Sequence, residues 1–133
     1  MKMKMLLRKL LISLVLLVLT ACGSGVTVGP FSSMYHDTDD YDNAVQELMT
    51  YFDGFDGADL KKIAYAGDKA VKAEADSRGL GVERIIVLTS TFETGDKDYQ
   101  NGLEPNHSYE DYTWILTRET SDTLWEIADH GIE

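Results

Sequence analysis

The only thiol in this chain of 133 residues belongs to Cys22, and a thiol is the side chain best suited to nucleophilic chemistry. An apolar run from Leu10 to Leu19, interrupted only by Ser13, precedes it and is followed by small residues. Four basic side chains open the chain: Lys2, Lys4, Arg8 and Lys9. This order is typical of a secretory signal peptide, and the run has roughly half the length that a helix needs to span a bilayer. We therefore predict a signal peptide over residues 1–21.

The four residues Leu19-Thr20-Ala21-Cys22 resemble the lipobox of bacterial lipoproteins. The resemblance implies that the Cys22 thiol is diacylglycerated and that signal peptidase II cuts directly before it. Cys22 is then a lipidation site that joins the mature chain to membrane lipid on the extracytoplasmic side of a bacterial membrane. Two acyl chains form a stable anchor, whereas a single chain binds only marginally. The alternative is an uncleaved N-terminal anchor with an unmodified cysteine.

Charge and cysteine content narrow the possible functions. Removal of residues 1–21 leaves 8 basic residues against 23 acidic ones, a formal charge of −15 compared with −11 for the full chain. Phosphate backbones repel such a domain, which argues against nucleic-acid binding. A lipidated Cys22 also leaves no thiol for a disulfide, a redox pair or a cysteine zinc site.

Two acidic clusters and three histidines are the candidates for metal binding. The segment 96–102 superficially resembles a calcium loop, but an EF-hand requires Gly at position 6 and Glu at position 12, where this chain has Asn101 and His107. The cluster at 37–42 is better explained as the capped start of a helix. The histidines show no zinc-ligand spacing. We predict no metal and no cofactor.

Residues 22–35 are rich in glycine and lack helical periodicity, which predicts a flexible tether after the lipidated cysteine. A tether of that length reaches at most about 45 to 50 Å. The remaining segment 36–133 is long enough for one hydrophobic core and contains no internal repeat. It is predicted to be a single domain.

Two helices precede three strands in the predicted domain. The first helix begins near Thr38, where aspartates supply N-cap oxygens, and its apolar stripe consists of Tyr41, Val45, Leu48, Met49 and Phe52. A short edge strand around 60–65 follows. A second helix opens at Asp68 and stops at Gly79.

The C-terminal half predicts three long strands. Residues 85–88 are apolar on both faces, as in a central strand, and alternation continues to Thr94. Residues 109–118 alternate again, and a last strand covers 124–130. The prediction is an α+β fold in which two N-terminal helices pack on a curved antiparallel sheet of three long strands plus a short edge strand.

This order of helices and strands, together with several short sequence motifs, resembles a family of bacterial lipoproteins of unknown function. The domain of that family is thought to be a nuclear transport factor 2-like, cystatin-related cone. The resemblance covers roughly 44–132, and two positions depart from it: Tyr112 in place of tryptophan, and Gly67-Asp68 in place of a more acidic pair. The matching residues are Tyr51-Phe52, Gly57, Leu60, Tyr65, 85–88, Ser90, Phe92, Pro105-Asn106, Tyr109, 114–118, Trp125, Asp129, His130 and Gly131. The resemblance implies an architecture and a location, but no activity.

Cone folds can enclose a pocket between their helices and the concave sheet face, and some relatives use an aspartate or histidine base with a tyrosine donor for proton abstraction. The candidate pocket-lining residues here are Tyr65, Trp114, Trp125 and Asp129. The alternative is that both tryptophans and Tyr65 fill the core, while Asp129 and His130 only end the last strand. No catalytic residue is predicted.

These observations favour a membrane-anchored, extracytoplasmic lipoprotein that acts as a non-enzymatic binding or accessory module of the cell envelope. Its partner is either another envelope protein or a small ligand, in addition to membrane lipid at Cys22. The alternative is a small-molecule enzyme that uses a cone pocket for acid/base chemistry. A two-lobed solute receptor does not fit a domain of this size.

Overall fold

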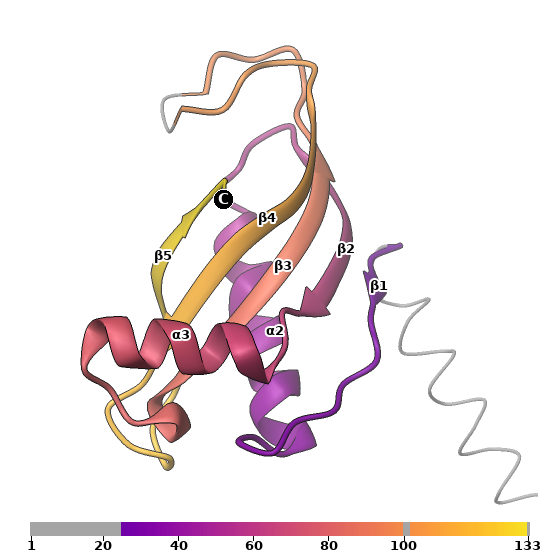
Figure 1. Ribbon diagram of the computed structural model, residues 1–133. Helices are drawn as coiled ribbons and strands as arrows, with labels where there is room; N and C mark the ends of the chain where they lie inside the picture. The colour runs from indigo at the N-terminus through magenta and orange to yellow at the C-terminus, as the bar shows by residue number, and fades with distance from the viewer. Residues whose placement is uncertain (1–24, 100–101, 133) are drawn as a thin grey trace, which may run out of the picture.

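The computed structural model describes residues 25–99 and 102–132 (Figure 1). Within these ranges one curved sheet has the strand order β1-β2-β3-β4-β5, in which β1 runs parallel to β2 and the other neighbours are antiparallel. The elements in chain order are β1 (Thr27–Val28), α2 (Thr38–Phe52), β2 (Asp59–Tyr65), α3 (Asp68–Arg78), the 3-10 turn η1 (Val82–Arg84), β3 (Ile85–Glu93), β4 (Ser108–Thr117) and β5 (Glu126–Gly131). The predicted α+β class is confirmed.

Helix α2 begins where the sequence predicts it. The Asp37 side chain accepts a hydrogen bond from the Asp40 backbone N–H at 2.8 Å, and the Asp40 side chain accepts one from the Asp37 N–H, so the two form a capping box. The predicted stripe is buried except for the half-buried Met49, and Ala44 joins it. α2 therefore packs one apolar face on the sheet.

Helix α3 lies on the opposite face of the sheet from α2 (Figure 1). It buries Val71 and Ala75 against Ile85, Val87 and Ile115, whereas α2 packs over the alternate residues of β3 and β4. The two helices therefore cover opposite faces of the sheet and do not enclose a common space over its concave face. The physical reason is visible in residues 85–88, because a strand that is apolar on both faces needs cover on both sides.

The segment expected to be a flexible tether is part of the domain from Val26 onward. Val26 is 4% exposed, and Thr27 and Val28 pair with Lys62 and Ile63 of β2. β2 is therefore the second strand of the sheet and not the predicted edge strand. The pairing could not be seen locally, because a two-residue strand depends on a partner about 35 residues away.

A β-bulge in β4 shapes the face that α2 covers. Ser90 and Phe92, two positions apart on β3, lie opposite Tyr112 and Tyr109, which are three positions apart on β4. The additional residue is accommodated at Asp111, which has a φ of +55°. The bulge lets both tyrosines enter the same core cluster, where regular alternation would place them on opposite faces.

The other connections are short except for the segment between β3 and β4, which extends beyond the end of the sheet (Figure 1). In the described part of that segment, Lys97 forms an ion pair with Asp56 of the loop after α2. No helix within the described residues is both long and apolar enough to cross a bilayer.

Candidate functional site

The space between α2 and the sheet is filled by aromatic side chains. Trp114 is completely buried, and its indole N–H donates a hydrogen bond to Ser90 Oγ at 2.7 Å. Its ring stacks on His130 at 4.9 Å between centroids and also contacts Phe52 and Phe55. Trp114 is therefore a residue of the core cluster on the α2 side of the sheet.

Tyr65 and Asp129 do not meet Trp114 in one site. The Tyr65 hydroxyl donates to Asp68 Oδ1 at 2.5 Å, and Ser33 Oγ lies 3.3 Å away. Burial, followed by this hydrogen bond, raises the pKa of Tyr65, so its hydroxyl remains a donor rather than a base. Asp129 is exposed and lies on the α3 side of the sheet, 3.5 Å from Arg78 Nη2. The four predicted residues therefore do not form an acid/base site.

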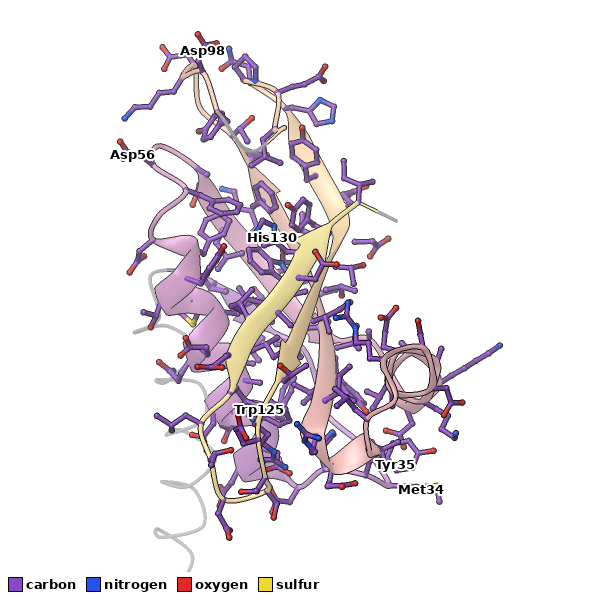
Figure 2. All side chains as sticks on the ribbon, turned by 90° about the vertical axis from the view of Figure 1, so that its left-hand side faces the viewer. Met34, Tyr35, Asp56, Asp98, Trp125 and His130 are labelled. Carbon is purple, nitrogen blue, oxygen red and sulfur yellow. The ribbon has the colours of Figure 1, made fainter. Side chains whose placement is uncertain are left out.

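Trp125 lies at the lower end of the molecule, away from His130 (Figure 2). It is 4% exposed, its indole N–H donates to the Asp40 carbonyl at 3.0 Å, and the Arg118 guanidinium carbon lies 4.1 Å from the ring centroid. The His36 ring meets it edge-on at 5.5 Å. Like Trp114, Trp125 is mainly a core residue.

Asp40 connects these groups. Arg118 Nη1 donates to Asp40 Oδ1 at 2.9 Å, and His36 Nδ1 lies 3.2 Å from Oδ2, while His36 Nε2 donates to the Ile85 carbonyl at 2.7 Å. Burial on its own raises the pKa of the Asp40 carboxyl. The hydrogen bonds to Arg118 and His36 lower the pKa by more than burial raises it, so the pKa lies below its ordinary value. The carboxylate therefore holds the start of α2 to the end of β4.

A hollow of about 260 Å³ opens beside this network. One wall is the N-terminal end of α2, with Asp37, Asp39 and Asn43, and the other is the β4–β5 connection, which contains Asp122 and the exposed Leu124. Asp40, Arg118 and Trp125 also line it. Because Asp40 already pairs with Arg118, the remaining charge of the hollow is negative. It is therefore complementary to a cationic rather than an anionic group.

The second cluster that combines polar and aromatic groups surrounds His130 on β5 (Figure 2). Its Nδ1 lies 2.8 Å from the Tyr112 hydroxyl, and its Nε2 lies 3.3 Å from the Tyr51 hydroxyl. Burial lowers the pKa of His130, although the Asp129 charge opposes the shift. The histidine therefore closes the aromatic interior as a neutral ring.

Metal binding has no geometric support in the described residues. Within 25–99 and 102–132, no group of three or more acidic, histidine or cysteine side chains is arranged to hold an ion. The predicted lipidation site, Cys22, lies outside the described residues, as do Gln100 and Asn101 of the rejected calcium loop.

Sequence reasoning identified Trp125 but missed its partners in the network. The signal for His36 and Asp40 was their spacing of four residues, which joins the segment before α2 to its first turn. Arg118 carried no local signal, because its partner lies 78 residues earlier. Comparisons with protein-family models, with curated proteins and with solved structures found no match.

Proposed function

We propose that this protein is a lipoprotein of the bacterial cell envelope, anchored on the extracytoplasmic side of the membrane through lipid on Cys22. The support is the sequence of residues 1–22, in which a basic start, a short apolar run and Leu-Thr-Ala precede the cysteine. The acidity of the mature chain is compatible with this location, because the acyl chains and not the protein charge hold it to the lipid.

The proposed activity is binding or accessory support of an envelope partner, without catalysis. The observation that carries this choice is the filled interior, because a small-molecule enzyme would need an open pocket between α2 and the sheet. Trp114 and the rings around it occupy that space, and their polar atoms are hydrogen-bonded. Contact with a partner must then use the outer surface, of which the acidic hollow beside Trp125 is one part.

We also propose membership of the lipoprotein family that the sequence resembles. A curved sheet whose last three strands form a meander, with a long helix across one face, is compatible with the nuclear transport factor 2-like cone. Helix α3 on the outer face is a departure from the simplest form of that architecture.

Cys22→Ala tests the anchor, since both thioether formation and the subsequent cleavage require the thiol. In a bacterial host the wild-type chain is expected in the membrane fraction in mature form. The variant is expected either as a precursor that retains residues 1–21 or as released protein. Wild-type and variant chains with the same distribution and the same length would contradict the proposal.

Tryptophan fluorescence distinguishes the module from the enzyme alternative. The chain has two tryptophans, so Trp125→Phe leaves Trp114 as the only one. Acrylamide should quench Trp114 weakly in the folded protein and strongly after denaturation. Strong quenching in the folded protein would mean that the interior is open and would favour the enzyme.

A further inference from the structure

We propose that the domain is held close against the bilayer with its β1–β2 edge toward the lipid and its β5 edge directed outward. This inference rests on the proposed lipidation of Cys22 and adds the orientation of the domain, together with the surface that meets the lipid.

The chain is fixed to the domain from Val26 onward. Val26 is 4% exposed within the core cluster, and the next two residues pair with β2. The Gly29 N–H then donates to the Ile63 carbonyl at 2.8 Å, and the Gly29 carbonyl accepts from the Tyr41 hydroxyl at 3.0 Å. Detaching this segment would expose Val26 and break both hydrogen bonds.

The residues that follow hold the same segment from its other end. Phe31 stacks on Tyr41 with 4.6 Å between ring centroids. Ser33 Oγ donates to Asp68 Oδ1 at 2.6 Å, and the Met34 N–H donates to Oδ2 at 2.7 Å. Contacts to β2, α2 and α3 therefore hold residues 26–34 on the domain. These residues consequently do not act as a spacer between the domain and the bilayer.

The covalent path from Cys22 to the domain is consequently very short. Four Cα–Cα steps separate Cys22 from Val26, which limits their distance to about 14 Å whatever conformation the intervening residues adopt. A tether that continued to residue 35 would reach several times farther. Val26, the residue directly before β1, must therefore lie within about 14 Å of the lipidated cysteine.

Together with the strand order, this short distance between Cys22 and Val26 determines which edge of the sheet faces the bilayer. β1 and β5 are the two edges of the sheet, four strand spacings apart, which is about 19 Å. The acyl chains pull at the β1 edge alone, so β5 lies farther from the lipid. β5, with His130 and the exposed Ile132 that follows it, is then accessible to an envelope partner.

The side chains next to β1 suit a lipid surface better than those at β5. Lys61 and Lys62 are exposed on β2 beside β1, where Lys61 forms an ion pair with Asp59 at 2.7 Å, and Val28 is 39% exposed. The β5 edge instead carries Glu126 and Asp129. In a domain with a formal charge of −15, this arrangement places Lys62 and the neutral Lys61–Asp59 pair toward the phosphate head groups, and Glu126 and Asp129 away from them.

Fluorescence quenching by lipid measures this orientation. The lipidated mature protein, with either Lys62→Cys or Glu126→Cys, is labelled with a small fluorophore, since the lipidated Cys22 thiol cannot react. Both positions are exposed polar sites on strands, so each serves as the control for the other. The labelled proteins are inserted into phosphatidylcholine vesicles that contain a lipid with a nitroxide on its head group.

The expected result is a larger loss of fluorescence at position 62 than at position 126. Insertion of about ten Gly and Ser residues after Gly25, which adds up to about 35 Å of reach, should abolish the difference. Lys61→Cys replaces Lys62→Cys if the latter does not fold. Equal quenching of proteins that float with the vesicles would overturn the orientation but leave the anchor intact. Protein that does not float with the vesicles would instead contradict the lipid anchor itself.

Discussion

Trp114 is the residue on which the packing between α2 and the sheet depends most. It is completely buried, and the three rings nearest to it come from β5, β4 and the loop after α2. Trp114→Ala should therefore lower the free energy of unfolding by about 3 to 5 kcal/mol, the cost of truncating a large buried aromatic side chain. Chemical denaturation measures this loss.

Leu124→Ala is the matched control, because Leu124 is apolar but 85% exposed. It should change the unfolding free energy by no more than about 0.5 kcal/mol. A loss below about 1 kcal/mol for Trp114→Ala would show that Trp114 tolerates truncation as a surface residue does, and its face would then have to be reassigned to a binding surface.

His130 should make stability depend on pH in the range where histidine titrates. Burial lowers its pKa in the folded state from the ordinary 6.5, so the unfolded chain binds the proton more readily. The contribution of the neutral His130 to the unfolding free energy should therefore be complete above pH 6.5. It should decrease as the pH falls through and below that value.

His130→Phe retains a ring against Trp114 but cannot titrate, so its unfolding free energy should change less between pH 7.5 and pH 5.5 than that of the wild type. Identical pH dependence in His130→Phe and the wild type would contradict the role assigned to His130.

At the scale of elements, helix α3 ends at a residue whose backbone requires glycine. Gly79 has a φ of +67°, and a Cβ placed there would have no neighbour within 4 Å, so only backbone strain opposes a side chain. Gly79→Ala should destabilise the domain by about 1 to 2 kcal/mol. Gly131→Ala is the control, because a Cβ at Gly131 also has no neighbour within 4 Å but the backbone φ is not positive. This variant should leave the melting temperature unchanged. Equal shifts of the melting temperature in the two variants would contradict the explanation.

The sequence was sufficient to predict elements whose signals are local. The capping aspartates and the apolar stripe located α2, Asp68 and Gly79 bounded α3, and alternation located the long strands. Arrangements that depend on distant partners were not predictable in this way. β1 is defined only by its pairing with β2, and the bulges in β2, β4 and β5 are not visible in a period-two pattern.

The candidate site illustrates the same limit. Trp125 and Ile127 pack in the core cluster on the α2 side, and regular alternation would place Asp129 there as well. A β-bulge between Ile127 and Asp129 reverses the alternation in the rest of β5. His130 therefore enters the aromatic interior, while Asp129 lies on the side of α3. Sequence reasoning selected Asp129 as the pocket residue, although it was the neighbouring histidine that lay inside.

At the scale of the whole molecule, net charge should affect stability. A mature domain with a formal charge of −15 repels itself, and salt screens exposed charges over about 10 Å at 0.1 M. The fragment 23–133 should therefore melt at a higher temperature in about 0.5 M NaCl than in low salt. CaCl2 at equal ionic strength is the control, and a much larger rise with calcium would contradict the absence of a metal site in the acidic clusters.

The lipid on Cys22 is the central claim about the whole molecule, because both the location and the orientation of the domain depend on it. Intact mass spectrometry of the protein extracted from bacterial membranes tests it most directly. The predicted result is a chain that begins at residue 22 and carries the added mass of diacylglycerol, with or without a further acyl group. A chain that begins at Met1 without lipid, or one that begins at residue 22 with an unmodified thiol, would contradict the claim.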